Sequence, residues 1–517
     1  MRGPPARGVR GGCGPSRGGE RLVCVRLRTV RGWSRPRGGA AHVTAPRAAE
    51  ARTGSGAAPR QPTGTRTTPG VATASPLGML AAMPPPSSTP PNQGEPPIGG
   101  TPGEVAPGPV VRDRDDACPG ALRLHTADDG KLARLRLPGG ILTNRQVEAL
   151  AVAAERYGDG HLGITSRGNT ELRGIGDHCG NGLAELLRHT ALLPSERHER
   201  VRNIVASPLA GLDGLGHGGL HSWLRELDAL LCAQDWTTAL SGRFLFALDD
   251  GRGDVTGLGG DVTLLAQGEG AALVRTGGAA PLRVAAADAP RAALAAARAF
   301  LAAADSAGTG AWRVRELPRG HEVDLAAALA RAGIPAEPAP VPRTVPASAP
   351  RPGVAPGPDG TYAVLVAPVL GRVTSAQLRA LAGPGGEVRI TPWRGFVVPG
   401  FDERGAHERL GDLGAAGFIT GPGSPWSGVG ACTGRPGCAK ALADVRRDAL
   451  PGTGGLPVYW SGCERRCGHP HGDWVDVTAT ADGRYTVTAR SGAAEQQLPY
   501  GEGELSDTIG RARGGGR

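Results

Sequence analysis

The sequence is almost without lysine and poor in aromatic side chains. Of 58 basic residues only Lys131 and Lys440 are lysine, and aromatic residues make up 4% of the 517 residues, beside 84 Gly and 46 Pro. No run of about 18 apolar residues occurs, so neither a membrane-spanning segment nor a secretory signal is expected. Nine cysteines in so long a chain exclude a small disulfide scaffold. We therefore expect a soluble, cytoplasmic protein of more than one domain.

The formal charge of +10 is confined to the N-terminal end. Residues 1–78 carry 14 Arg against two Glu, a net charge of +12, which leaves −2 for all the residues after them. The residues after 78 therefore have no excess positive charge that would favour a general phosphate-binding surface. Neither nucleic acid nor a membrane surface is an expected partner.

Residues 1–115 contain mainly Gly, Pro, Arg, Ser and Thr, without a sustained hydrophobic period. Such a composition buries too little apolar surface to offset the entropy of the chain, and it predicts a disordered low-complexity extension. Two interpretations of the extension stay open. Either an upstream start codon was assigned in place of Met79 or Met83, or the segment is a genuine basic arm.

One pattern occurs twice in the remaining chain. The copies read Thr143-Asn-Arg-Gln146 with Ile164-Thr165-Ser-Arg167-Gly168, and Thr374-Ser-Ala-Gln377 with Ile390-Thr391-Pro-Trp-Arg394-Gly395. Each Thr-x-x-Gln is a capping box, so a helix is expected to begin at the same point of both copies. A strand precedes each box, over 131–137 and 361–367, and an Arg-Gly turn follows the next strand. The pattern predicts a duplicated α+β unit.

Further elements are expected around these copies. Periodicity predicts helices over 219–233, 290–305 and 439–450, and turn residues predict hairpins at 249–251 and 482–483. The Pro-rich residues 335–358 predict a semi-rigid linker between the two halves.

Four cysteines fall close together as Cys432, Cys438, Cys463 and Cys467, in the spacing C-x5-C-x24-C-x3-C. Gly434, Pro436 and Gly437 let the first pair curl, and the x3 spacing puts the second pair on one side of a turn. A four-cysteine iron–sulfur cluster suits these spacings, and the expected helix after Cys438 would direct free amides at it. Zinc and unrelated structural cysteines stay open as alternatives.

The segments around these cysteines resemble the cluster motif of the sirohaem-dependent sulfite and nitrite reductase superfamily. They are Ala431-Cys432-Thr-Gly-Arg-Pro-Gly-Cys438-Ala-Lys440 and Ser461-Gly462-Cys463-Glu-Arg-Arg-Cys467-Gly468-His469-Pro470. Within it, the chain is most similar to the precorrin-3B synthase family of aerobic cobalamin biosynthesis. Supporting segments are Cys118-Pro-Gly120, Leu135-Arg-Leu-Pro-Gly139-Gly140, Thr165-Ser-Arg167-Gly-Asn169, Leu172-Arg173-Gly174, Arg202-Asn203-Ile-Val-Ala-Ser207-Pro208 and Thr391-Pro-Trp393-Arg394-Gly395.

The resemblance implies an α+β protein of duplicated reductase-like architecture. After the extension at 1–115, we expect a ferredoxin-like half-domain at 116–195 and an α/β domain without a cluster at 196–334. The linker at 335–358 would lead to a second ferredoxin-like half-domain at 359–422, a 4Fe-4S domain at 423–505 and a flexible tail at 506–517.

The implied function is that of a 4Fe-4S monooxygenase that converts precorrin-3A to precorrin-3B by oxygen-dependent hydroxylation at C20 and closure of a γ-lactone. Its partners would be the tetrapyrrole, dioxygen and an external electron donor, and a second, non-haem iron stays open. One alternative is a sulfite or nitrite reductase, which would also carry sirohaem. The other is a non-catalytic metal-binding scaffold.

Arginines are the expected anchors for the acetate and propionate groups of such a substrate, because the planar guanidinium binds a carboxylate through two parallel hydrogen bonds. The segments of the resemblance suggest Arg167, Arg173, Arg202, Arg243 and Arg394. Catalytic residues stay unknown. His469 and His471, beside the cysteines, could serve a second iron or a proton relay.

One segment departs from the reductases. Where they carry a Lys-Phe-Lys-like element, this chain has Gly242-Arg243-Phe244-Leu245, so one of two cations is replaced by leucine. A group that stabilises charge and supplies protons in the reduction of a small oxyanion is thereby lost. This departure argues against the reductase.

Overall fold

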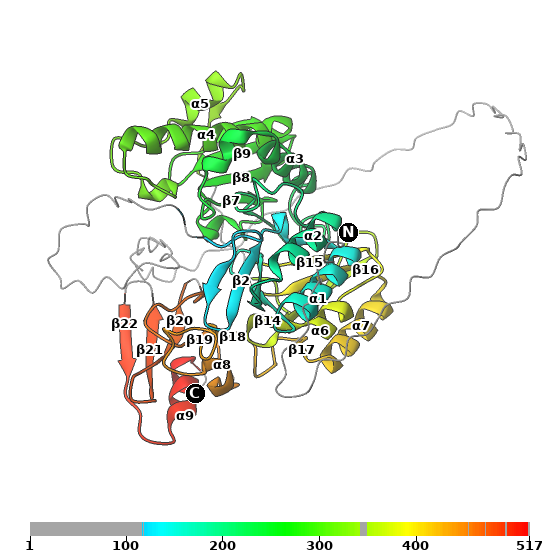
Figure 1. Ribbon diagram of the computed structural model, residues 1–517. Coiled ribbons are helices and arrows are strands. Elements are labelled where there is room, and N and C mark those ends of the chain that lie inside the picture. Colours follow the sequence, from blue (N-terminus) through cyan, green and yellow to red (C-terminus); the bar gives the residue numbers. More distant parts are fainter. Residues whose placement is uncertain are drawn as a thin grey trace, which may run out of the picture. The chain divides into compact units, whose positions relative to one another are not determined.

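The computed structural model describes residues 116, 118–341, 349–452, 454–470, 472–491 and 494–514 (Figure 1). The extension predicted for residues 1–115, the middle of the Pro-rich segment and His471 lie outside the described residues. No helix in the described ranges has both the length and the apolar character that a membrane crossing requires.

Both capping boxes are present. The Thr143 hydroxyl accepts from the Gln146 amide at 3.2 Å and the Gln146 side chain accepts from the Thr143 amide at 3.0 Å, which starts α1 (Asn144–Tyr157). Thr374 and Gln377 repeat the two bonds at 3.1 and 3.0 Å at the start of α6 (Ser375–Ala380). The second helix is shorter because the segment Gly383-Pro384-Gly385-Gly386 follows it and cannot continue a helix.

Replacing Thr374 with alanine removes a hydroxyl that satisfies one of the free amides of α6. We expect the free energy of unfolding to fall by about 1 kcal/mol. Chemical denaturation measures the change. Ser375→Ala, one residue further on, is the matched control and should leave the stability nearly unchanged, so an equal loss in both variants would contradict the cap.

Two antiparallel sheets form the duplicated part of the fold. The first sheet has the order β1 (His125–Ala127), β2 (Gly130–Leu135), β5 (Thr170–Ile175), β4 (His161–Ile164) and β14 (Arg372–Thr374). The second has the order β12 (Gly353–Pro356), β13 (Tyr362–Pro368), β16 (Phe396–Phe401), β15 (Glu387–Ile390) and β3 (Ile141–Thr143), with β17 (Phe418–Ile419) on β13. Their helices are α1, α2 (Gly180–His189), α6 and α7 (Glu403–Ala415).

The two halves exchange strands. β3 of the first half pairs with β15 of the second half, and β14 of the second half pairs with β4 of the first half. A single apolar core accordingly draws on both halves, from Leu150 of α1 to Leu378 of α6. The half-domains expected at 116–195 and 359–422 are therefore interlocked.

The duplication also extends to the two larger domains. The third sheet has the order β6 (Ile204–Ala206), β7 (Phe246–Asp249), β8 (Val262–Gln267), β9 (Ala271–Thr276), β10 (Leu282–Ala285) and β11 (Glu337–Pro338), with helices α3 (Leu220–Ala233), α4 (Ala289–Ala307) and α5 (Leu325–Arg331). The fourth has β18 (Val429–Ala431), β19 (Val458–Ser461), β20 (Trp474–Ala479), β21 (Tyr485–Ser491) and β22 (Ala494–Leu498), with α8 (Val445–Asp448) and α9 (Leu505–Ala512). In both sheets the first three strands are parallel and the next two are antiparallel.

Short 3-10 turns complete the secondary structure. They are Pro138–Gly140, Asp235–Ala239, Thr256–Leu258, Ala286–Asp288, Val314–Glu316 and Val369–Gly371.

The helices predicted over 219–233 and 290–305 are confirmed as α3 and α4, and the hairpin around Asp482 is confirmed as β20–β21. The hairpin at 249–251 is wrong because β7 and β8 are parallel, so a crossover leaves β7 there. The helix over 439–450 is wrong except for Val445–Asp448.

The ends of the second half also differ from expectation. The tail predicted from residue 506 contains most of α9. This helix packs beside β21, with Ile509 buried and the Arg513 guanidinium donating to three backbone carbonyls (Figure 1). The described ends of the Pro-rich segment form β11 and β12, which belong to different sheets.

Candidate metal centre and substrate cavity

The four cysteines lie in the loops that leave two neighbouring parallel strands. Cys432 follows β18 directly, Cys463 follows β19 after one residue, and Ala431 pairs with Trp460 across the two strands. Because the carboxyl ends of parallel strands meet at one edge, the two loops converge there. The Gly462 amide donates to the Cys432 sulfur at 3.2 Å. Burial raises the pKa of Cys432, and this amide opposes the rise.

Glycines allow the two loops to pack closely. Gly434 has a φ of +67°, and a Cβ there would lie 2.8 Å from the Val445 side chain. A Cβ on Gly462 would lie 2.7 Å from the Cβ of Ala441, and the Leu442 amide donates to the Gly462 carbonyl at 2.7 Å. The described residues directly after Cys438 do not form the predicted helix, so no helix dipole points at this cysteine. They form turns that bond to the other cysteine loop instead.

The four sulfurs are not drawn together around a single point. All four thiols are free, and among the described residues no three of them lie within 4.8 Å of one another. A tetrahedral zinc ion with Zn–S bonds of about 2.3 Å would hold its sulfurs about 3.7 Å apart. Four thiolates are a donor set that zinc and iron–sulfur clusters both take.

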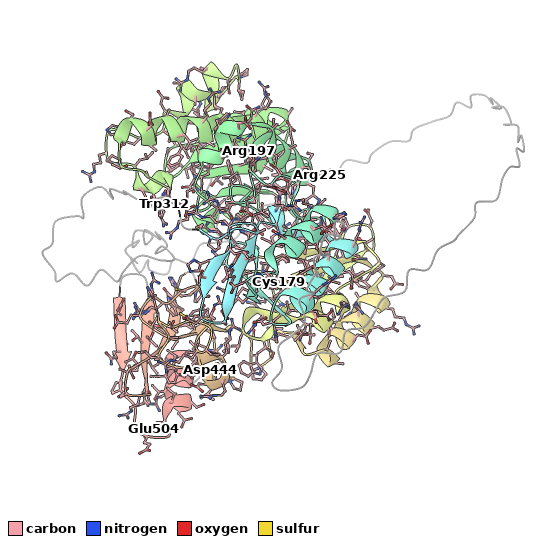
Figure 2. All side chains as sticks on the ribbon, in the orientation of Figure 1. Cys179, Arg197, Arg225, Trp312, Asp444 and Glu504 are labelled. Carbon is pink, nitrogen blue, oxygen red and sulfur yellow. The ribbon has the colours of Figure 1, made fainter. Side chains whose placement is uncertain are left out.

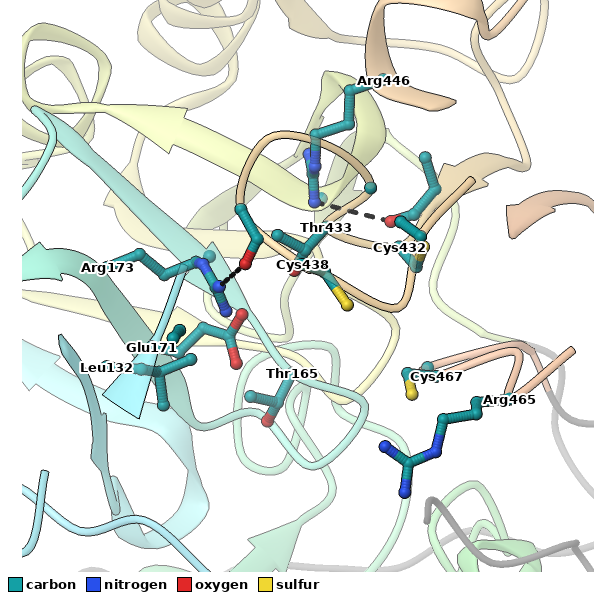
Figure 3. Close-up of a pocket in the computed structure, with 18 of the residues that line it drawn as sticks. Leu132, Thr165, Glu171, Arg173, Cys432, Thr433, Cys438, Arg446, Arg465 and Cys467 are labelled. Atoms are coloured by element: carbon teal, nitrogen blue, oxygen red, sulfur yellow. Dashed lines mark hydrogen bonds between the residues drawn. The ribbon is translucent and has the colours of Figure 1, made fainter. Parts of the chain in front are cut away.

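The cysteines open onto a cavity of about 400 Å³, the cysteine cavity (Figure 3). Its walls come from the first sheet, from the turns of the second half and from both cysteine loops. The carboxylates in its wall are Asp128 and Glu171. The cations in its wall are Arg134, Arg173, Arg394, Lys440, Arg446, Arg465 and Arg466. The wall thus has an excess of positive charge suited to a polyanionic ligand.

Some of these cations are already paired with carboxylates. Arg134 contacts Glu171 at 3.0 Å, and Arg173 binds both oxygens of Asp129 at 2.8 and 2.9 Å while donating to the Gly437 carbonyl at 2.5 Å. Although burial raises it, the pKa of Glu171 is held below its ordinary value by Arg134 and Arg173. Arg173 thereby joins the first sheet to the cysteine loop, besides lining the cavity.

Other cations keep their charge available. Arg394 donates to the Gly468 carbonyl at 2.5 Å and lies 5.8 Å from the centre of the Tyr459 ring, and Arg446 donates to the Leu370 carbonyl at 3.2 Å. Figure 3 shows Arg465 beside Cys467. No carboxylate within the described part of the chain forms an ion pair with Arg394, Arg446, Arg465 or Lys440. These four cations can receive ligand carboxylates without breaking an existing ion pair.

Arg394 does not occupy the place of Arg167 in the duplicated turn. The Thr165 amide donates to the Asn169 carbonyl at 2.8 Å, and the Thr391 amide donates to the Gly395 carbonyl at 2.9 Å, so the two turns have equal length. Gly168 has a φ of 66° and Arg394 has a φ of 61°. Arg394 is therefore equivalent to Gly168 and keeps a left-handed backbone, a conformation that favours glycine.

Arg167 and Arg243 form a second cationic group behind the same turn. Thr165 and Ser166 line the cysteine cavity, and the Arg167 guanidinium, just beyond them, donates to the Arg243 carbonyl at 3.1 Å. Arg243 lies 4.9 Å from the centre of the Trp312 ring, in the domain of the third sheet (Figure 2). Burial, and then the charges of Arg313 and Arg136, lower the pKa of Arg167 to about 9. An anion beside Arg167 would relieve this repulsion.

Arg202 is not a cavity residue. Its guanidinium binds both oxygens of Asp228 on α3, each at 2.7 Å, and its side chain is 7% exposed. This bidentate pair uses the hydrogen bonds that a substrate carboxylate would need. This pairing assigns Arg202 to fastening α3, and its predicted role in substrate binding gains no support from it.

His469 is engaged in packing. Its ring stacks on Trp474 with centroids 5.0 Å apart, and its Nδ1 lies 2.8 Å from the Pro470 carbonyl oxygen. Burial lowers its pKa, so the neutral ring is favoured. The proposed role as an iron ligand or proton relay gains no support from these contacts.

Several cations of the cysteine cavity were not predicted from the sequence. Lys440, Arg465 and Arg466 lie within two residues of a cysteine, so the cysteine motif itself could have pointed to them. Arg134 and Arg446 carried no such signal in a chain with so many arginines. Only the fold brings them to the cavity wall.

Asp476 positions the second cysteine loop. It is 1% exposed and binds Arg466 at 2.5 Å and Arg490 at 3.0 Å, and Arg466 has a left-handed φ of 47° between Cys463 and Cys467. Asp476→Asn leaves the two guanidinium groups without their buried carboxylate. We expect cluster retention to fall about 10- to 100-fold. Iron release to a chelator measures it, and exposed Asp507→Asn is the control, so equal release from both variants would contradict this role.

The family comparison agrees with this architecture. The nitrite/sulfite reductase ferredoxin-like half-domain family matches residues 125–186 and 355–415, the two interlocked halves. The two matched segments are thus similar to this half-domain family, in agreement with the duplication seen in the fold. The solved structure of the Mycobacterium tuberculosis NirA protein has the same fold, with a TM-score of 0.59 at 19% identity, over 74% of this chain and 80% of that chain.

Two relatives differ in how much of the chain they match. A precorrin-3B synthase of Sinorhizobium sp is 28% identical over 387 residues, which cover 70% of this chain and 80% of that protein. A ferredoxin–nitrite reductase of Synechococcus elongatus is 37% identical over 127 residues, but these cover 23% of this chain and 25% of the reductase. The similarity to the synthase thus extends over most of both proteins.

Proposed function

We propose that this chain is a 4Fe-4S oxidoreductase that converts precorrin-3A to precorrin-3B. The observation that carries the proposal is the cysteine cavity, in which four free thiols share one wall with a set of cations that exceeds the carboxylates. The similarity to a precorrin-3B synthase over most of the chain supports this substrate. A cytoplasmic location is part of the proposal.

The cations hold the substrate by its acidic side chains. Arg394, Arg446, Arg465 and Lys440 would bind acetate and propionate groups, and Arg167 and Arg243 would bind groups that reach past the Thr165 turn. Several fixed contacts orient a rigid macrocycle, so that one meso carbon faces the reacting oxygen. Neutralised carboxylates also lower the cost of desolvating the substrate in the cavity.

Cys432, Cys438, Cys463 and Cys467 would hold the cluster, which supplies one-electron transfer when bound. In the proposed reaction one oxygen atom of O₂ enters the hydroxyl at C20 and the other leaves as water. Two electrons from an external donor and two protons balance the step. The ring A acetate then closes the γ-lactone by adding its oxygen to the ring carbon next to C20. The double bond between these two carbons is consumed, the carboxyl proton balances the new hydroxyl, and no group leaves. A second, non-haem iron stays open, and no ligands are assigned to it.

A sirohaem-dependent sulfite or nitrite reductase is the second candidate, because nitrite reductases match parts of the chain. The buried surroundings of Leu245 count against it. This residue stands where the reductases carry a second cation, is 1% exposed and belongs to an apolar cluster with Val205, Ala247 and Val255. A scaffold without catalysis remains the third candidate.

The absorption spectrum of the anoxically purified chain, before and after dithionite, tests these candidates. We expect a broad absorption that dithionite bleaches, without sharp tetrapyrrole bands. Precorrin-3A supplied with oxygen and an electron donor should then be converted to precorrin-3B. Sirohaem bands would move the assignment to the reductase. A featureless spectrum with bound zinc, and no turnover, would move it to the scaffold.

A further inference from the structure

The loops of the third sheet repeat the geometry of the cysteine loops with oxygen donors in place of sulfur. Ser207 follows β6 as Cys432 follows β18, and their amides donate to Leu248 at 3.0 Å and to Trp460 at 2.9 Å across the parallel strands. The Asp250 amide donates to the Ser207 hydroxyl at 3.2 Å, and the Gly462 amide donates to the Cys432 sulfur at 3.2 Å. Ser207 is thus the counterpart of the first cysteine of the metal centre.

Three carboxylates gather beside Ser207. Asp249 ends β7, Asp250 follows it, and Asp254 lies on the loop beyond. One oxygen from each lies within 4.8 Å of the others. The residues are 0%, 0% and 6% exposed. Buried carboxylates at such a separation need compensating positive charge.

The surrounding residues supply only part of that charge. Arg252 binds Asp250, but it also binds Asp213 at 2.7 Å. The Oδ1 of Asp254 accepts from the Ser207 hydroxyl at 2.6 Å, whereas its Oδ2 is buried and has no hydrogen-bond donor among the described residues. The orphan oxygen belongs to a side chain that is more than nine-tenths buried and lies in the group of three carboxylates. A cation bound here would contact this oxygen and offset the remaining negative charge.

We propose that Asp249, Asp250 and Asp254, with Ser207 beside them, form a binding site for a divalent cation that prefers oxygen ligands, such as Mg²⁺, Mn²⁺ or Ca²⁺. Carboxylate and hydroxyl oxygens are the donors that these hard cations take, whereas four thiolates suit an iron–sulfur cluster. The duplicated fold thus carries a soft metal centre in one half and a hard one at the equivalent edge of the other half.

The cation site has a structural role. Neither of the two described cavities includes its carboxylates. Val255, directly after Asp254, belongs to a small apolar cluster against which Trp393 packs. Trp393 immediately precedes Arg394 of the cysteine cavity. A cation that fixes the loop over 249–255 therefore also supports the turn that carries Arg394.

Titration of the full-length, anoxically purified chain tests the site after EDTA treatment and desalting. Electron paramagnetic resonance counts free Mn²⁺, and calorimetry measures Mg²⁺ and Ca²⁺. We expect one bound cation per chain and a rise of Tm with cation concentration, while the iron content stays constant. A wild-type chain that binds no cation at millimolar free ion would overturn the proposal, whatever the variants do.

Asp254→Asn keeps the size of the side chain and removes its charge. In cation-free buffer we expect a higher Tm than in wild type, because the repulsion among the carboxylates falls. With cation the order should reverse, since affinity drops at least about tenfold. Asp305→Asn, exposed on α4, is the matched control and should behave as wild type. Undiminished binding in Asp254→Asn, or no reversal of the order, would show that the orphan oxygen does not bind a cation.

Discussion

Cys463→Ser is expected to remove nearly all cluster iron from the purified chain. Cys463 lies in the wall of the cysteine cavity, and the serine hydroxyl does not replace a thiolate as a ligand of iron. The loss should show as missing iron and sulfide and as loss of the absorption that dithionite bleaches. Because metal binding and folding are coupled, Tm should fall as well.

Cys232→Ser is the matched control for this variant. Cys232 is a free, half-buried thiol on α3 and lies outside both described cavities. It should keep its full complement of iron. If Cys463→Ser retained iron and sulfide, the four-cysteine assignment would fall. If wild type and Cys232→Ser instead contained one zinc per chain and Cys463→Ser contained none, the metal rather than the ligand set would be reassigned.

The convergence of the four cysteines and the internal repeat could be predicted because their signals are local. A capping box needs four consecutive residues, and both boxes were found with their helix starts. The four cysteines stand close in sequence and line one cavity. Such signals predict only the general fold. No short segment of the sequence indicates that β3 pairs with β15 of the second half, or that β14 pairs with β4 of the first half.

Predictions that depended on distant partners failed for a physical reason. The segment 439–450 has helical periodicity, yet the Leu442 amide donates to the Gly462 carbonyl, and this contact with the other cysteine loop replaces a helical turn. The tail contains many small residues, yet α9 covers the fourth sheet near β21. In each case tertiary contacts override a local preference.

The roles of the arginines could not be predicted for the same reason, because their partners are distant in sequence. From its motif, Arg202 was as good a candidate as Arg167, because the sequence does not show that Asp228 lies opposite its guanidinium on α3. Conversely, Arg446 became a candidate only when the fold placed it in the cavity wall. Whether an arginine has a carboxylate partner decides between a structural and a binding role, and that partner is usually remote in sequence.

Arg167→Ala and Arg202→Ala are therefore expected to have opposite effects. Without Arg167, the substrate loses a charge-assisted contact worth about 2 to 5 kcal/mol, so kcat/KM for precorrin-3A should fall at least about 30-fold. Stability should change by less than about 1 kcal/mol, because the lost bond to the Arg243 carbonyl is offset by weaker repulsion from Arg136 and Arg313.

Arg202→Ala should destabilise the fold instead. It leaves Asp228, whose side chain is 22% exposed, without its bidentate partner. The free energy of unfolding should fall by about 2 to 4 kcal/mol, less than for a fully buried pair because water still reaches the carboxylate. The kcat/KM per folded molecule should stay close to that of wild type.

Denaturation and turnover of both variants, beside Arg404→Ala, decide between the two roles. The Arg404 side chain is 88% exposed and, among the described residues, forms an ion pair only with Glu408 one turn away, so its loss should affect neither measurement. Substrate titrations without oxygen separate binding from chemistry. If Arg167→Ala binds and converts precorrin-3A as wild type does, the cationic group behind the Thr165 turn does not hold the substrate. Binding is then left to the four unpaired cations of the cysteine cavity.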